Sequence, residues 1–195
     1  GWWFRLSGKI KKHLCETEQA RIILKKLINQ RKESGKREDD LLDMLLEARY
    51  EDGSEMEEKQ LIDEILILFT AGHETTSNAL TFTCELLARN VQIQETLFSE
   101  IIEAEKNSET LMDFIKNCPF TKNVIEESLR LYPPAYFIDR VNIEEDEFNG
   151  MKIPKNSSLL FSLLEIHTNP KYWDEPQKFK PERFSKANAK QFSGH

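Results

Sequence analysis

Proline is confined to the last part of the sequence, and this distribution limits the fold more than any other feature. All seven prolines lie at or after Pro119. Proline has no amide hydrogen and its ring clashes with the preceding helical turn, so helix interiors exclude it. The 118 residues before Pro119 are therefore free to form long helices, whereas the remainder must contain turns, short strands and irregular chain. We expect a mainly α fold with a small β region late in the chain.

The longest apolar-periodic segment, residues 57–89, predicts a central helix. Leu61, Ile65 and Leu68 recur at helical spacing within it. A helix of this length would span about 45 Å, the width of a whole domain. Apolar residues cover much of its circumference, so we expect this helix to be buried. Ser54 with Glu57 resembles a capping box at its start.

The other elements follow from the same periodicity and from turn residues. Helices are expected over residues 9–34, 41–46, 91–106, 111–117 and 118–131, with Asp39 or Asp40 as the cap of the second. Weak alternation predicts a strand over 141–148 that meets a hairpin turn at Asn149-Gly150, and a second strand over 157–164 that leads into a short helix at 165–167. From residue 169 onward, alternating prolines and aromatic residues indicate a meander without regular structure.

The pattern of the central helix changes in its middle. Gly72 costs about 1 kcal/mol relative to alanine in a helix interior. Glu74 places a carboxylate on an otherwise apolar helix, which is costly unless the charge is used or paired. The hydroxyl of Thr75 can bond to the Ala71 carbonyl and bend the helix. On this segment alone two interpretations stay open: a helix groove with a proton donor beside it, or a kinked core helix with a solvated glutamate.

Composition excludes several functional classes. The net charge of −7 and the pI near 5.3 argue against a nucleic-acid partner, and no basic stripe is present. The three cysteines have no paired spacing and are expected to be reduced thiols. The longest apolar run, residues 62–71, carries Asp63 and Glu64 and is too short to span a membrane. With no signal peptide visible, we expect a soluble, cytoplasmic protein.

A second group of residues carries paired charge. Glu127 and Arg130 are three residues apart on a predicted helix, so their side chains can meet. Arg183 lies in a segment fixed by proline and aromatic residues. If Arg183 packs against Glu127, the three residues form a buried charged network that could hold the meander in place. The alternative is that both arginines are unrelated surface residues.

Three motifs in this order resemble the cytochrome P450 family of haem-thiolate monooxygenases, and the resemblance covers nearly the whole chain. The motifs are Ala71-Gly72-His73-Glu74-Thr75-Thr76, Glu127-Ser128-Leu129-Arg130 and Pro181-Glu182-Arg183-Phe184. They are similar to the family's oxygen-activation segment on its long central helix, its Glu-x-x-Arg helix and its meander motif. The resemblance implies that residues 1–195 form one partial cytochrome P450 domain.

The resemblance also implies roles on the haem side. Thr75 would be the alcohol that hydrogen-bonds dioxygen at the haem iron or the water beside it. Glu74 would be the acid that links bulk solvent to the distal oxygen, since cleaving the O–O bond needs protons delivered without flooding the site. Ala71 and Gly72 would lie against the haem face. Arg140 matches the arginine that pairs with a haem propionate.

Further roles follow from the same resemblance. Glu127, Arg130 and Arg183 would be the structural triad of the haem-side core, and the distal pocket would be lined by Ala135, Tyr136 and Phe137. The implied cofactor is haem b, with electrons from NAD(P)H delivered through a ferredoxin or a flavoprotein reductase. The implied substrates are O2 and a small apolar organic molecule.

One expected feature is missing from the sequence. The family's iron ligand is a cysteine in a glycine-rich loop soon after the meander motif, and the sequence stops at Ser193-Gly194-His195 before such a loop. Cys15, Cys84 and Cys118 lie in predicted helices, so none is expected to ligate iron. We therefore expect an internal fragment that has no metal ligand of its own and does not turn over alone. His167 receives no haem role.

Two other interpretations of the sequence differ from this one. His73-Glu74-Thr75-Thr76-Ser77 is similar to a zinc-protease motif, but the second histidine, required four residues after the first, is replaced by Ser77. That site is rejected. A non-catalytic helical module derived from the enzyme family remains the alternative. The missing ligand loop favours it, and the intact Glu74 and Thr75 argue against it.

Overall fold

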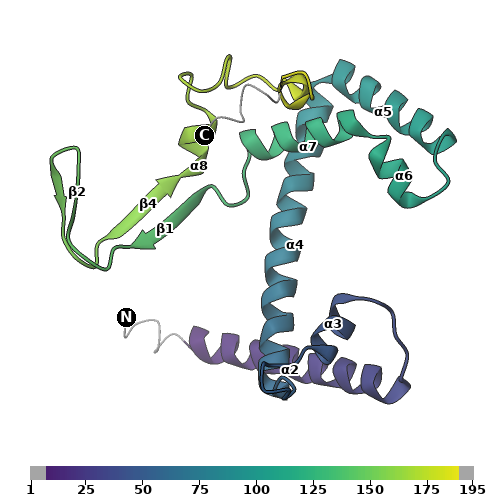
Figure 1. The fold of residues 1–195 in the computed structure, drawn as a ribbon, viewed down its shortest axis with the longest axis vertical. Helices are drawn as coiled ribbons and strands as arrows, with labels where there is room; N and C mark the ends of the chain where they lie inside the picture. Colours follow the sequence, from purple (N-terminus) through teal and green to yellow (C-terminus); the bar gives the residue numbers. More distant parts are fainter. Residues whose placement is uncertain (1–7, 189–195) are drawn as a thin grey trace. The chain divides into compact units, whose positions relative to one another are not determined.

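The computed structural model describes residues 8–188 (Figure 1). The chain divides into two compact units, residues 1–73 and 74–195. The helices are α2 (Lys9–Ser34), α3 (Leu41–Glu47), α4 (Glu58–Arg89), α5 (Val91–Lys106), α6 (Leu111–Lys116), α7 (Pro119–Leu131), α8 (Leu163–His167) and the 3-10 helix η1 (Pro181–Phe184). The strands are β1 (Phe137–Val141), β2 (Asp146–Phe148), β3 (Met151–Ile153) and β4 (Ser158–Ser162). The expectation of a mainly α fold with a small β region is confirmed.

The first unit packs α2, α3 and the beginning of α4 around a small apolar core. Ile28, Leu61 and Ile62 are its buried residues. The partly buried side chains that surround them are Leu24, Leu42, Leu45, Leu46, Met56, Ile65 and Leu66. Gly35 ends α2 in a left-handed conformation with φ 59°, which costs glycine little because it has no Cβ.

Arg31, Asp40 and Asp43 fasten the loop between α2 and α3. The Arg31 guanidinium donates to Asp40 Oδ2 at 2.7 Å and to Asp43 Oδ1 at 2.6 Å. Asp40 caps α3, since its Oδ1 accepts from the Asp43 amide at 3.0 Å. Of the two candidate caps, Asp40 is therefore the correct one. The hydrogen bond from the Arg31 guanidinium lowers the pKa of Asp40 to about 2.

The long helix α4 has nearly the predicted bounds but not the predicted burial. Residues 67–78 are all exposed, including Phe69 at 67%. The buried positions lie toward the two ends, at Leu61 and Ile62 and again at Thr83 and Leu86. The prediction of a buried central helix is therefore wrong for its middle. Apolar periodicity identifies a helix face that packs against other apolar groups, but it does not say whether those groups belong to these 195 residues.

The expected capping box at the start of α4 is also wrong. The Ser54 hydroxyl and amide both donate to Asp52 Oδ1, at 2.6 and 2.9 Å. The nearby Asp52 carboxylate holds the Ser54 hydroxyl as a donor within the turn, and no capping bond from Ser54 to a helix amide is formed among the described residues. Helix α4 begins at Glu58.

In the second unit α7 is the most buried element, and its N-terminus is capped by a residue of α5. Glu100 Oε1 accepts from the Phe120 amide at 2.6 Å, and Oε2 accepts from the Thr121 amide at 2.8 Å. The first amides of a helix have no partner within the helix and carry partial positive charge, so a carboxylate there is stabilising. At the other end of α7, Tyr132 stacks on Phe82 of α4 at 4.6 Å between ring centroids.

The β region consists of two antiparallel pairs, β1 with β4 and β2 with β3. Asn149 and Gly150 join β2 to β3 with φ of 52° and 79°, as a type I′ hairpin requires, so the predicted hairpin is confirmed. The predicted single strand over 141–148 is wrong, because Asn142 interrupts it. Its side chain accepts from the Ser157 amide at 2.7 Å and donates to the Pro154 carbonyl at 2.9 Å, which ends β1 at Val141.

The remaining elements agree with expectation except for one. β4 leads directly into α8, as predicted for the second strand. The segment after residue 169 is irregular, but residues 181–184 form the 3-10 helix η1, which the sequence did not predict. Within residues 8–188, no helix combines the length and the hydropathy needed to cross a bilayer.

Candidate functional site

The structure brings Glu127, Arg130 and Arg183 together in the second unit. Arg130 donates from Nε to Glu127 Oε2 at 2.7 Å and from Nη2 to Oε1 at 2.8 Å, a bidentate pair one helical turn apart on α7. Arg183, on η1, donates from Nε to Glu127 Oε1 at 3.3 Å. Glu127 is fully buried, and the two arginines are 2% and 9% exposed. A carboxylate with no access to water thus faces two guanidinium groups.

Backbone contacts attach the 174–184 segment to this network. The Lys180 amide donates to Glu127 Oε1 at 3.0 Å, and Arg183 Nη2 donates to the Glu175 carbonyl at 2.8 Å. The Glu175 side chain pairs with Lys178 and Lys180, whose ammonium groups lower its pKa to about 2. The irregular segment is therefore held by hydrogen bonds to buried charge rather than by a sheet or a long helix.

Arg130 also reaches α8. Its Nη1 donates to the His167 carbonyl at 2.7 Å. The His167 ring lies edge-on to Trp173, and its Nδ1 is buried without a hydrogen-bond partner among residues 8–188. Burial disfavours the charged imidazolium, which lowers the pKa of His167.

In the first unit, the small residues of α4 lie on an open part of the helix. Ala71 and Gly72 are exposed, and a Cβ built on Gly72 would meet no heavy atom within 4 Å. The His73 ring stacks on the Phe69 ring one helical turn earlier, with ring centroids 5.8 Å apart. A flat group could approach the backbone closely at Gly72, and a haem face has that shape.

Glu74 and Thr75 belong to the second unit and are both exposed. The Ser77 hydroxyl donates to the Glu74 carbonyl at 3.0 Å. An exposed carboxylate and a neighbouring hydroxyl are chemically able to exchange protons with solvent. Their predicted catalytic role stays a prediction.

Arg140 lies on β1, on the same face as a group of apolar residues. In the antiparallel register Arg140 is opposite Leu159 and Ile138 is opposite Phe161, and paired residues project to the same side of the ribbon. Arg140 Nη1 donates to the Asp139 carbonyl at 2.7 Å. A single guanidinium among apolar side chains suits a ligand that carries a carboxylate on an apolar body, as a haem does.

The residues expected to line a substrate pocket begin the same ribbon. Ala135, Tyr136 and Phe137 are exposed, and the last two rings pack edge to face at 4.8 Å. The Tyr136 carbonyl accepts from the Leu163 amide at 2.9 Å, which ties this segment to the start of α8. Their contact with a substrate remains a prediction.

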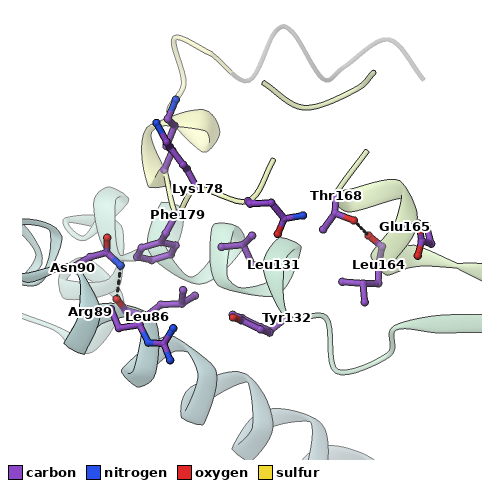
Figure 2. Close-up of a pocket in the computed structure, with 12 residues that line it drawn as sticks. Leu86, Arg89, Asn90, Leu131, Tyr132, Leu164, Glu165, Thr168, Lys178 and Phe179 are labelled. Carbon is purple, nitrogen blue, oxygen red and sulfur yellow. Dashed lines mark hydrogen bonds between the residues drawn. The ribbon is translucent and has the colours of Figure 1, made fainter. Parts of the chain in front are cut away.

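A cavity of about 650 Å³ lies in the second unit between the ends of α4 and α7, α8 and the 177–180 segment (Figure 2). Leu86, Leu131 and Phe179 are among the apolar residues on its wall, and Glu165 and Lys178 among the charged ones. None of the site residues expected from the sequence lines this cavity. It therefore gives no support to a substrate site at Ala135–Phe137.

The cysteines and other metal-ligating residues form no metal site in the described part of the chain. Across residues 8–188, no three His, Cys, Asp or Glu side chains lie close enough together to hold an ion. Cys15 and Cys84 are exposed on α2 and α4, and Cys118 is buried at the N-terminal end of α7.

The sequence is similar to those of known proteins. The family model described as Cytochrome P450 matches residues 2–195. Cyclooctat-9-en-7-ol 5-monooxygenase of Streptomyces melanosporofaciens is 33% identical over 88% of this chain and 38% of its own length. Mouse cytochrome P450 3A13 is 35% identical over 82% of this chain and 33% of its own length. The chain thus spans about a third of the length of these relatives.

Two solved structures have a similar fold. A retinoic acid-bound cyanobacterial protein, CYP120A1, superposes with a TM-score of 0.76 at 32% identity, covering 86% of this chain and 38% of that one. A second structure, of CYP102L1, superposes with a TM-score of 0.84 over 95% of this chain and 43% of that one. At 24% identity the second match concerns the fold alone.

Proposed function

Because this chain belongs to the cytochrome P450 family and has part of that family's fold, we propose that the protein containing it is a haem-dependent monooxygenase. The reaction inserts one oxygen atom of O2 into a small apolar organic substrate, with electrons from NAD(P)H passed on by a ferredoxin or a flavoprotein reductase. The chain covers only about a third of its relatives, so this activity is assigned to the whole protein. We also propose that both compact units belong to one cytochrome P450 domain.

The observation that carries the proposal is the exposed middle of α4 with its small residues and its acid–alcohol pair. In this stretch Gly72 leaves open space at its backbone, and Glu74 and Thr75 follow at once. Bound haem supplies the chemistry that activates O2. Ala71 and Gly72 suit close approach of its flat face, because a larger side chain at either position would occupy that space.

Proton delivery is the role proposed for the acid–alcohol pair. The Glu74 carboxylate would take up a proton from solvent and release it toward the distal side of the haem. The Thr75 hydroxyl would hold the water or oxygen atom that receives this proton, and so fix where the proton arrives. A positioned acid or base typically contributes 10²- to 10⁴-fold to a rate.

Binding roles are proposed for the β1 region and for the charged network. Arg140 would pair with a haem propionate, because it is a single cation on an apolar face. Ala135, Tyr136 and Phe137 would contact the apolar substrate. The Glu127–Arg130–Arg183 network would hold the 174–184 segment in the position that the cofactor's binding region requires.

We further propose that these 195 residues do not turn over alone. The resemblance places the iron-ligating cysteine in a glycine-rich loop after the meander, and Cys15, Cys84 and Cys118 all precede it. A cysteine thiolate in that loop would hold the haem iron and supply electron density to it.

The carbon monoxide difference spectrum tests both statements. The complete protein reconstituted with haem is expected to give the red-shifted Soret band of a thiolate-ligated haem, and the 195-residue chain is not. A thiolate-type band from the chain alone would contradict the inactive-fragment proposal. No such band from the complete protein would contradict the proposed monooxygenase.

A further inference from the structure

Most of the N–H donors of the Arg130 guanidinium have a hydrogen-bond acceptor. A guanidinium has five N–H donors in one plane. Nε and Nη2 bind the two oxygens of Glu127, Nη1 donates to the His167 carbonyl at 2.7 Å, and Nη2 also lies 3.4 Å from the Lys178 carbonyl. These contacts fix the plane but do not cover its faces. At 2% exposure, Arg130 has almost no water to cover them.

The Trp173 ring lies against this guanidinium. The Arg130 Cζ lies 5.0 Å from the centroid of the Trp173 ring, within the range of a cation–π contact. Tryptophan has the strongest ring quadrupole for such a contact, and desolvation increases its contribution.

The orientation of Trp173 is fixed from the same helix that binds Arg130. Trp173 Nε1 donates to the Ile166 carbonyl at 3.1 Å, and Arg130 donates to the carbonyl of the next residue, His167. Both carbonyls belong to the last turn of α8, where helix carbonyls lack helical partners and carry partial negative charge. Two consecutive carbonyls therefore align an indole and a guanidinium against each other. Phe184, at 6.0 Å between ring centroids, packs against the indole as well.

We propose that Trp173 is a positioning residue of the Glu127 network: its ring binds the buried Arg130 cation and holds the guanidinium at the angle that both Glu127 and α8 require. The role acts through Arg130 and involves no contact with a cofactor or substrate. It is therefore independent of the proposed monooxygenase activity. It predicts that the electron density of the ring, and not only its volume, determines the stability of the second unit.

Graded fluorination of Trp173 tests this. In the full chain with Trp2→Phe and Trp3→Phe, Trp173 is the only tryptophan left, since the sequence has three. Growth on mono-, di- and trifluorotryptophan then weakens the ring quadrupole at this site with little change of shape. We expect the unfolding equilibrium constant to rise stepwise with each fluorine, by about 5- to 30-fold over the series. Fluorine makes the ring more apolar, so a purely space-filling role predicts no rise.

Two variants complete the design. Trp173→Phe, grown in the same media, contains no tryptophan and should show no dependence on the analogue. Trp173→Leu should lose more stability than Trp173→Phe, because phenylalanine retains a π face. A flat or falling unfolding constant across the fluorinated series, with Trp173→Leu still destabilised, would show that Trp173 only fills space and would overturn the proposal. That result would not contradict the proposed monooxygenase, which the carbon monoxide spectrum of the complete protein tests separately.

Discussion

Replacing Glu127 by glutamine should destabilise the second unit strongly. The substitution removes the negative charge that faces two buried guanidinium groups. The carboxylate accepts hydrogen bonds from Arg130, Lys180 and Arg183 at 2.7 to 3.3 Å. Removing one partner of a buried ion pair typically costs about 3–5 kcal/mol, because the remaining charge is left uncompensated. Glutamine keeps one carbonyl acceptor, so we expect a loss of about 3 kcal/mol, at the lower end of this range.

Thermal and urea unfolding measure this loss. For a chain of this size, about 3 kcal/mol corresponds to a fall of the melting temperature by about 6–12 °C. Trp173 lies beside the network, so its fluorescence in a Trp2→Phe, Trp3→Phe background reports on this unit, and circular dichroism reports on all helices.

The neighbouring residue provides a matched control. Glu126 pairs with Lys122 at 3.7 Å and is partly exposed, so Glu126→Gln should change the free energy of unfolding by less than about 0.5 kcal/mol. The two variants remove the same charge from adjacent positions of one helix. Equal effects, or a loss below about 1 kcal/mol in Glu127→Gln, would refute the argument that the buried network holds the 174–184 segment.

Three further predictions concern charges outside this pair. Arg31 lowers the pKa of Asp40 to about 2, so the first unit should lose stability as the pH falls from about 4 to about 2. When the unfolding midpoint is measured against pH, Asp40→Asn should show a smaller fall over this range. Burial lowers the pKa of His167, so the unfolded chain binds a proton at a higher pH than the folded chain does. The second unit should therefore lose stability as the pH decreases from about 6.5, and His167→Gln should abolish this loss in the same measurement. Glu100→Gln weakens the cap of α7 and should cost about 1 kcal/mol in urea unfolding, whereas the exposed Glu103→Gln should cost nothing measurable.

The sequence predicted the features that depend on local patterns. The bounds of α4 follow from apolar spacing over many turns, and the β2–β3 hairpin follows from Asn149-Gly150, because few other residues adopt two consecutive positive φ angles. The two motifs that contain Glu127 and Arg183 suggested an ion pair between residues 56 positions apart, and the structure places them 3.3 Å apart.

Distant contacts that no motif marked could not be predicted. The middle of α4 has the pattern of a core helix, yet Ile67 to Asn78 are exposed, since a periodic sequence does not reveal which neighbours lie beside it. Asn142 ends β1 by bonding residues 12 to 15 positions later, and no local pattern announces this.

Trp173 was expected only as one aromatic residue of the meander. Its place against Arg130 depends on α8 supplying two consecutive carbonyls to two different side chains. The sequence signal that could have found it is the tryptophan itself, six residues after His167 and ten before Arg183.

The coupling of electrons to product in the complete protein tests the central claim most directly. If Glu74 and Thr75 deliver protons to activated oxygen, Thr75→Ala should release a larger share of the NAD(P)H electrons as hydrogen peroxide, Thr75→Ser should restore the wild-type share, and Glu74→Gln should slow NAD(P)H oxidation by about 10²-fold or more. The carbon monoxide spectrum should be unchanged in all three. An unchanged peroxide share in Thr75→Ala, together with an unchanged rate in Glu74→Gln, would contradict the account.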